Sequence, residues 1–266
     1  MSMSIPVALT IAGSDSGGGA GIQADIKAMQ ANGVFAASVI TAITAQNTVA
    51  VTDAMDLPLN LIRAQIEAVM TDLPVAAAKT GMLSTHGIIE TVATSVRDFG
   101  IGPLVVDPVM ISKSGFSLLN ESAVDALISE MLPLAAVCTP NAHEAARLVG
   151  GDILTESDAI DAAKAIHAMG PGAVLVKGGH LDAETDAVDV LFDGDDVTII
   201  RSPRIDTPHT HGTGCTYAAA IAARLAHGDS VTDAVRTAHD YVHEAIKAGL
   251  PIGKGHGPTD HFYFLR

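Results

Sequence analysis

The sequence of 266 residues has little of several features that would point to particular classes of protein. Aromatic residues make up 3% of the chain, and tryptophan is missing. Two cysteines, Cys138 and Cys215, are too few for a disulfide framework in a chain of this length. The first residues show no basic region followed by an apolar one, so we expect no secretory signal. Gly, Asp or Lys interrupts every apolar run, so we expect no membrane span.

Positive charge is also scarce. Lys and Arg number 15 against 30 Asp and Glu, which gives a formal net charge of −15. Nucleic acids and anionic membranes are bound by basic surfaces, so neither is expected as a partner. A small phosphate ligand remains compatible, because backbone amides and one or two cationic side chains can hold it. Together these features predict a cytoplasmic protein.

What the sequence has instead is an alternation of aliphatic runs and amphipathic stretches. Aliphatic runs predict strands at 7–13, 35–44, 75–82, 104–110, 135–141 and 173–177. Amphipathic stretches predict helices between them, and the residues around Asp193-Gly194 predict a β-hairpin within 186–202. This alternation is typical of an α/β fold with a mostly parallel sheet and helices on both faces. Because no linker, repeat or break in composition interrupts it, we expect a single domain over residues 1–266.

Glycines and polar residues gather just after the predicted strands. They occupy Gly13–Gly21, Gln46–Asn47, Lys79–Met82, Asp107–Met110, Asn141–Glu144 and Lys177–His180. In open α/β sheets the ligand lies beyond the carboxyl ends of the strands. We therefore expect these segments to share one site.

The first glycine-rich segment, Gly13–Gly21, lies between a predicted strand and a predicted helix. Gly19, Gly21 and Ala24 match a G-x-G-x-x-A pattern, which raises the alternative of a dinucleotide-binding Rossmann fold. That fold needs an acidic residue about 20 positions later to hold a ribose hydroxyl. The segment 38–47 contains no carboxylate, so a tight turn that lets the backbone approach a small substrate is favoured.

The second glycine-rich segment includes Gly212, Thr213 and Gly214 and runs directly into an alanine-rich predicted helix. Unpaired backbone amides and the positive end of the helix dipole make such a turn an anion site, although a simple helix cap would look the same. An anion site here would stabilise charge on a phosphoryl group during transfer. The Gly253-Lys254-Gly255 segment lacks the other residues of a Walker A motif, so a P-loop kinase is excluded.

Cys215 falls in the first turn of that helix. The helix dipole is expected to favour its thiolate, which would let it act as a base toward a substrate hydroxyl, although a small buried residue is the plain alternative. Cys138 lies in a predicted strand and is expected in the core.

Further polar residues suggest a nucleotide and a metal ion. Asp107 ends an aliphatic strand, where a carboxylate is costly unless it is paired or bound to metal. Asn141 and Glu144 begin a predicted helix and would either cap it or contact MgATP. Lys177 ends a strand and could meet a phosphate.

The eleven histidines show no zinc-ligand spacing. His209 and His211 flank the second glycine turn and are expected to line the site. The histidines on predicted amphipathic helices are expected at the surface; they are His167, His227, His239 and His243.

Taken in order, these motifs resemble a known family over nearly the whole chain, from about residue 7 to 262. They are Ala12–Asp25, Ser38–Thr48, Lys79–Leu83, Val106–Met110, Thr139–Glu144, Val176–His180, Thr210–Thr216 and Gly253–Pro258. The family is that of the hydroxymethylpyrimidine/phosphomethylpyrimidine kinases of thiamine biosynthesis. The resemblance implies a ribokinase-like three-layer α/β/α sandwich, a homodimer, and MgATP as the phosphate donor. It also implies two phosphorylations of 4-amino-5-hydroxymethyl-2-methylpyrimidine, first of its hydroxymethyl group and then of the monophosphate.

The resemblance assigns roles to residues as well. Gln46 would bind the pyrimidine edge through its amide, and Gly13, Met82, Asp25 and Val109 would complete the substrate site. Gly212, Thr213 and Gly214 would form the anion hole beside Cys215, where many members of the superfamily carry a catalytic Asp. Asp107 and Glu144 would organise Mg²⁺, and Lys177, Asn141 and Glu144 would contact ATP.

Three other functions compete with this one. A pyridoxal kinase of the same superfamily would also phosphorylate a ring hydroxymethyl group, but Cys215 and Gln46 favour the thiamine-pathway enzyme. A pyrimidine- or nucleotide-binding protein without activity would not need the anion hole, the carboxylates and Lys177 together. An NAD-linked oxidoreductase is opposed by the missing ribose carboxylate.

Overall fold

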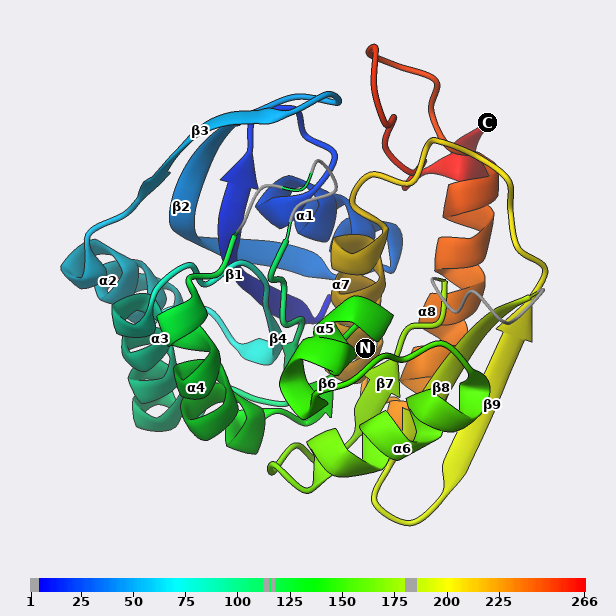
Figure 1. Cartoon of the computed structure of the whole chain (residues 1–266). Helices are drawn as coiled ribbons and strands as arrows, with labels where there is room; N and C mark the ends of the chain where they lie inside the picture. The colour runs from blue at the N-terminus through cyan, green and yellow to red at the C-terminus, as the bar shows by residue number, and fades with distance from the viewer. Residues whose placement is uncertain (1–4, 112–114, 116–117, 180–185) are drawn as a thin grey trace.

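The chain folds around one sheet covered by helices on both faces (Figure 1). A computed structural model describes residues 5–111, 115, 118–179 and 186–266. The strands of the sheet are β1 (Val7–Asp15), β2 (Phe35–Gln46), β3 (Val51–Asp56), β4 (Val75–Thr80), β5 (Leu104–Val106), β6 (Val137–Cys138), β7 (Val174–Val176), β8 (Ala187–Phe192) and β9 (Val197–Ser202). Their order is β3-β2-β1-β4-β5-β6-β7-β8-β9.

The middle of the sheet is parallel and its edges are antiparallel. Strands β2, β1, β4, β5, β6 and β7 pair in parallel, whereas β3 pairs antiparallel to β2 and β8 pairs antiparallel to β7 and β9. The mostly parallel sheet and the hairpin within 186–202 are therefore confirmed. Because parallel strands direct their carboxyl ends to the same edge, the polar segments that follow them converge.

Helices form a layer on each face of the sheet. They are α1 (Gly21–Ala31), α2 (Leu59–Met70), α3 (His86–Phe99), α4 (Val124–Ala126), α5 (Ala142–Val149), α6 (Glu156–His167), α7 (Thr213–Ala226) and α8 (Val231–Lys247). Alternate residues of β1 face the two layers, since Leu9 belongs to the core cluster that includes residues of α2 to α6, and Ala8 belongs to the cluster that includes residues of α1, α7 and α8. Five alanines of α7 are fully buried, and their small size lets this helix pack tightly between the sheet and its neighbours.

Prolines shorten two strands relative to the sequence prediction. β5 ends before Asp107-Pro108 and β6 ends before Pro140, because proline has no N–H to donate to a neighbouring strand. Residues 121–131 are irregular, with a 3₁₀ turn, a short α-helix and a π-helical turn in succession. Thr85 caps α3 and accepts a hydrogen bond from the amide of Ile88. Within the described ranges, no helix combines the length and apolar character needed to cross a membrane.

Candidate active site

A cavity of about 900 Å³ opens at the carboxyl-terminal edge of the central strands. It is lined by the ends of β1, β2, β4, β5 and β7 and by the first residues of α7, with α8 at the far end. All of the predicted site residues except Asp25 and His209 line it; His209 packs instead against Gly249 and Gly257, so its predicted place in the site is wrong. The residues that do line it are Gly13, Gln46, Met82, Asp107, Val109, Asn141, Glu144, Lys177, His211, Gly212, Thr213, Gly214 and Cys215. The prediction that segments far apart in the sequence share one cavity is confirmed for the described residues. His180, at the end of one predicted segment, lies outside them.

Near the ends of β1 and β4, Gly13 and Met82 line the cavity side by side. A methyl group added at Gly13 would lie 3.0 Å from the sulfur of Met82, so glycine is needed for this close approach. The carbonyl of Met82 is fixed in turn by the hydroxyl of Thr41, which donates to it at 2.8 Å. This surface lies in the same cavity as the carboxamide of Gln46, which is a suitable arrangement for a flat ring with a polar edge.

The turn before α7 presents backbone amides to the cavity. Gly212 is the N-cap and has a φ of 78°, in the left-handed region that favours glycine. A side chain at this position would also collide with the carbonyl oxygen of Gly19. The first amides of an α-helix have no partner within the helix, and the helix dipole adds positive potential there. The turn is thus built to hold an anion.

Lys177 and Asp107 form an ion pair beside this turn. Lys177 Nζ donates to Asp107 Oδ1 at 2.8 Å, and the hydroxyl of Thr139 donates to the same oxygen at 3.2 Å. A methyl group added at Gly214 would lie 3.3 Å from Lys177 Nζ. Burial acts to lower the pKa of Lys177, but the carboxylates of Asp107 and Glu144 outweigh it and raise the pKa above its ordinary value. A cation is therefore kept next to the amide turn.

Glu144 is the third residue of α5 and makes a reciprocal cap with Asn141. Asn141 Oδ1 accepts from the amide of Glu144 at 2.9 Å, and Glu144 Oε2 accepts from the amide of Asn141 at 2.8 Å. Burial raises the pKa of Glu144 to about 7; Asp107 adds to the shift and Lys177 opposes it. Capping, one of the two predictions for this pair, is confirmed, and the backbone of Met110 also hydrogen-bonds to the Glu144 carboxylate.

Because the pKa of Glu144 is raised, we expect the free energy of unfolding to fall as pH rises from about 4.5 to about 7. In that window the folded protein holds a proton that the unfolded chain releases. Glu144→Gln preserves the cap acceptor but cannot ionise. From pH 5 to pH 8, its free energy of unfolding should therefore fall by about 1–3 kcal/mol less than that of the native protein. Urea unfolding at the two pH values measures the difference. Parallel losses in the two proteins would show that Glu144 does not titrate in this range.

The pKa of Cys215 differs from the sequence prediction. Burial raises the pKa of its thiol to about 11, and Asp25 and Asp107 add to this, although Lys79 acts to lower it. The expectation that the helix dipole favours the thiolate is therefore wrong for the free protein, because removal from water outweighs the dipole. Cys138 is fully buried in β6, as predicted.

Asp25 is the predicted substrate residue that the structure places outside the cavity lining. Its side chain is fully buried, and both carboxylate oxygens accept from Lys79 Nζ, at 3.0 and 2.9 Å. The hydroxyl of Thr10 donates to it at 2.6 Å. A direct contact with substrate is not compatible with this position. Asp25 instead fixes Lys79, which does line the cavity and acts electrostatically on Cys215.

The sequence prediction missed a buried polar group near α8. Asp189 accepts from the amide of Gly178 at 2.9 Å and lies 3.0 Å from His239 Nδ1. His239 is 7% exposed, so its predicted surface position is wrong. Asp189 and His239 are 50 residues apart, and neither stands in a motif, so only the packing of β8 against α8 brings them together.

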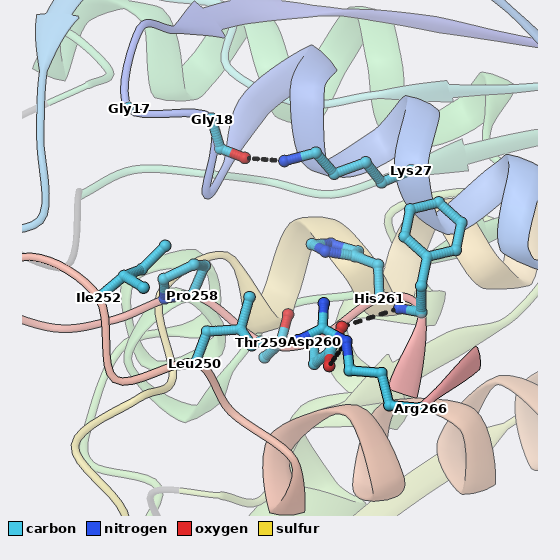
Figure 2. A pocket seen from close by; sticks show the side chains of 11 residues that line it. Gly17, Gly18, Lys27, Leu250, Ile252, Pro258, Thr259, Asp260, His261 and Arg266 are labelled. Carbon is cyan, nitrogen blue, oxygen red and sulfur yellow. Dashed lines mark hydrogen bonds and ion pairs between the residues drawn. The ribbon is translucent and has the colours of Figure 1, made fainter. Parts of the chain in front are cut away.

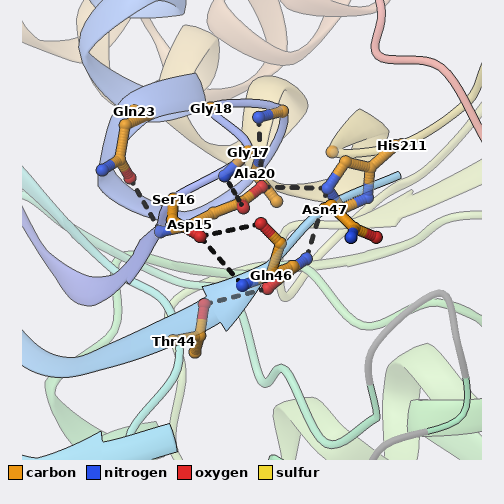
Figure 3. Close-up of polar contacts among 12 residues, drawn as sticks. Asp15, Ser16, Gly17, Gly18, Ala20, Gln23, Thr44, Gln46, Asn47 and His211 are labelled. Carbon is orange, nitrogen blue, oxygen red and sulfur yellow. Dashed lines mark hydrogen bonds and ion pairs between the residues drawn. The ribbon is translucent and has the colours of Figure 1, made fainter. Parts of the chain in front are cut away.

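A second missed group surrounds Gln46. His211 lies 3.0 Å from Asp15 and 3.3 Å from Gln46, so its predicted place in the site is confirmed, while Asp15 had no assigned role (Figure 3). Behind the glycine loop, residues of the carboxyl-terminal segment and α1 enclose a smaller cavity of about 230 Å³. There Lys27 reaches from α1 to the carbonyl of Gly18 at 2.7 Å (Figure 2). This contact and the packing of Pro258 against the loop hold the glycine segment in place.

A family model described as phosphomethylpyrimidine kinase matches residues 15–260. The chain belongs to this family. The hydroxymethylpyrimidine/phosphomethylpyrimidine kinase of Streptomyces coelicolor is 51% identical over 260 residues, covering 98% of this chain and 96% of the relative. The kinase of the same name from Haemophilus influenzae is 50% identical over 262 residues and covers 97% of each chain.

Solved structures confirm the ribokinase-like fold. A phosphomethylpyrimidine kinase from Clostridium difficile superposes with a TM-score of 0.81 and is 44% identical, covering 91% of this chain and 100% of that one. A Bacillus subtilis pyridoxal kinase, solved as an ADP complex, superposes with a TM-score of 0.92 and is 41% identical, covering 98% and 99%. Both activities considered at the sequence level therefore occur among close structural neighbours.

Proposed function

We propose that the protein transfers a phosphoryl group from ATP to the hydroxymethyl group of 4-amino-5-hydroxymethyl-2-methylpyrimidine, and then a second one to the monophosphate. The observation that carries the proposal is one continuous cavity lined by Gln46, by the amide turn of Gly212–Cys215 and by Lys177 beside that turn. Family membership and relatives named for these two substrates support it.

The substrate ring would lie against Gly13, Met82 and Val109, with its aminopyrimidine edge on the carboxamide of Gln46. A carboxamide offers one acceptor and one donor side by side, which matches the amino group and the adjacent ring nitrogen. In the first step the hydroxyl oxygen bonds to the γ-phosphorus, and the bond from that phosphorus to the bridging oxygen breaks. ADP leaves, and the hydroxyl proton passes to Cys215 or to water.

The phosphates of ATP would lie between Lys177 and the turn of Gly212, Thr213 and Gly214. The amides of Gly212 and Gly214 would donate to them, while that of Thr213 donates to the carbonyl of Thr210 at 3.3 Å. The ammonium of Lys177 carries a full positive charge and the amides carry partial positive charge, and both are in place before the substrate binds. They would therefore stabilise the transferring phosphoryl group without reorganisation of the site. Asn141 is joined to Lys177 by an isolated β-bridge, which places the α5 cap on the same side of the cavity.

The carboxylates of Asp107 and Glu144 fit a Mg²⁺ ion shared with the phosphates. Mg²⁺ in phosphate sites is held by one or two carboxylates together with phosphate oxygens and water. The donor set agrees with this, since the described residues contain no ready cluster of three His, Cys, Asp or Glu ligands. A cation bound here would lower the pKa of Glu144 from its raised value and so favour the carboxylate. A bound Mg²⁺ would neutralise negative charge on the phosphates of ATP.

We further propose that the protein is a homodimer that pairs through the β2–β3 ribbon and the start of α2. Five of the six residues of β3 are exposed, so one edge of the sheet is open. Exposed apolar side chains accompany this edge; they are Ile43, Val49, Met55, Leu59 and Leu61. A second copy would cover both the strand edge and these side chains, and sedimentation velocity would detect it.

The function is tested by a coupled ADP-release assay with MgATP and three acceptors, namely hydroxymethylpyrimidine, its monophosphate and pyridoxine. We expect turnover of the first two, with kcat/KM for pyridoxine lower by about tenfold or more. Pyridoxine as the preferred substrate would replace the proposal with the second candidate, a pyridoxine kinase, which the Bacillus subtilis neighbour favours. No turnover of any acceptor by folded protein would overturn both.

A further inference from the structure

The carboxamide of Gln46 is surrounded by polar groups, and their other partners restrict which of them can donate and which can accept a hydrogen bond (Figure 3). One end of the carboxamide lies 3.1 Å from the hydroxyl of Thr44, and the other lies 3.3 Å from His211 Nε2. The same ring nitrogen lies 3.0 Å from Asp15 Oδ2. Thr44, Asp15 and His211 are each 7% exposed or less, so protein groups and not bulk water must satisfy them.

Asp15 determines whether Nε2 of His211 carries a hydrogen. Its carboxylate accepts from the amides of Gly17, Gly19 and Ala20, at 2.7, 3.0 and 2.8 Å. Burial acts to raise the pKa of Asp15, but its hydrogen bonds with His211 and these amides lower it below the ordinary value. Asp15 is therefore a carboxylate that only accepts, and His211 Nε2 must carry a hydrogen and donate to it.

A ring nitrogen that carries a hydrogen cannot also accept one. The group of Gln46 that faces His211 must then be the acceptor of the carboxamide, which is its oxygen. The two ends of a carboxamide have the same shape, so the partners determine which end is which. Thr44, the second neighbour of the carboxamide, is compatible with this orientation. Its hydroxyl can donate its hydrogen to the carbonyl of Ser14 at 3.0 Å and accept from the nitrogen of Gln46.

We propose that Asp15 and His211 are positioning residues that hold the Gln46 carboxamide with its oxygen toward His211 and its nitrogen toward Thr44. With the nitrogen of Gln46 toward His211 instead, two donors would face each other. The consequence for binding of the pyrimidine ring rests on the proposed function. The 4-amino group donates to the Gln46 oxygen on the His211 side, and the adjacent ring nitrogen accepts on the Thr44 side.

The backbone around these side chains keeps the arrangement rigid. The main chain of Gln46 both donates to and accepts from the hydroxyl of Ser16, at 2.8 and 2.7 Å. The amide of His211 donates to the carbonyl of Gly257 at 3.0 Å. A side chain at Gly19 would collide with the ring of His211, so the glycine loop packs directly on the imidazole. The three segments that carry the network are thus fixed to one another before substrate binds.

The protonation state is tested on the free protein, independently of activity. Long-range ¹H–¹⁵N spectra at pH 7.5 should show a hydrogen on Nε2 of His211, assigned by loss of its signals in His211→Phe. Asp15→Asn should change the His211 resonances, since a carboxamide can accept or donate where the carboxylate only accepts. An Nε2 of His211 without hydrogen would overturn the proposal, even if the protein phosphorylates the pyrimidine as expected.

The positioning role is tested with the substrate and with its analogue that lacks the 4-amino group. His211→Phe should raise KM for the aminopyrimidine about tenfold and leave KM for the analogue and for ATP within about twofold. The variant should therefore discriminate less between the two acceptors. His227→Phe, at an exposed position, is the matched control. In a Gln46→Ala background, His211→Phe should have little further effect. Equal losses for both acceptors, or additive losses with Gln46→Ala, would show a structural role only.

Discussion

Replacing Cys215 with alanine is expected to slow phosphorylation of the hydroxymethylpyrimidine by about 10²–10⁴-fold, the range for loss of a general base. The dissociation constant of ATP should change little, because the amide turn and Lys177 remain. The thiol has a pKa of about 11 in the free protein, so the thiolate is a minor form at pH 7. The thiolate fraction increases with pH, and kcat should therefore rise by about tenfold per pH unit below the pKa of the complex.

The second phosphorylation supplies an internal control for Cys215. Its nucleophile is a phosphate oxygen, which has already lost its proton at pH 7 because the second pKa of a phosphate monoester is about 6. A base has no proton to remove there, so Cys215→Ala should slow this step by less than about tenfold. Single-turnover kinetics with each acceptor between pH 6 and pH 9 provides the comparison. Equal effects on both steps, or an unchanged alkaline rise in the variant, would rule out Cys215 as the base.

The fold could be predicted from sequence because its signals are local. Runs such as Val7–Ile11 and Val174–Val176 alternate with amphipathic stretches, and parallel pairing follows from that alternation. β3 was missed because most of its residues are exposed and show no apolar alternation. It forms only because β2 extends to Gln46 and offers it an edge.

Positions in the site could be predicted better than electrostatic states. The order of the motifs, and the rule that ligands lie beyond the carboxyl ends of parallel strands, correctly predicted that Gln46, Lys177 and the turn before α7 share one cavity. The pKa of Cys215 depends on burial under the sheet edge, and the place of Asp25 depends on Lys79, 54 residues away. Those contacts arise from packing between distant segments, which no single motif records.

The largest effect on stability is expected at the buried pair of Lys79 and Asp25. Both side chains are 0% exposed. Burial raises the pKa of Asp25, and Lys79 and Thr10 oppose the shift. Lys79→Met leaves a buried carboxylate without its cation, which typically costs about 3–5 kcal/mol in the free energy of unfolding. The variant should also slow turnover, since the ammonium acts to lower the pKa of Cys215.

The pH dependence of Lys79→Met identifies the cause of its instability. Without Lys79 the pKa of Asp25 should rise further, so the folded variant holds a proton that the unfolded chain releases above its ordinary pKa of 3.8. Its stability should therefore fall as pH rises from 4 toward the new pKa, and the penalty should be larger at pH 8 than at pH 5. Urea unfolding of both proteins at the two pH values measures this.

A second substitution separates the lost ion pair from lost packing. Asp25→Asn in the Lys79→Met background keeps an acceptor for Thr10 and removes the unpaired charge, so it should restore part of the stability at pH 8. In the native background the same change leaves Lys79 buried without its counter-ion and should destabilise the protein. The two substitutions must then be strongly non-additive in a double-mutant cycle. Additive losses that do not vary with pH would mean that Lys79 and Asp25 stabilise the fold through packing alone and not through their charges.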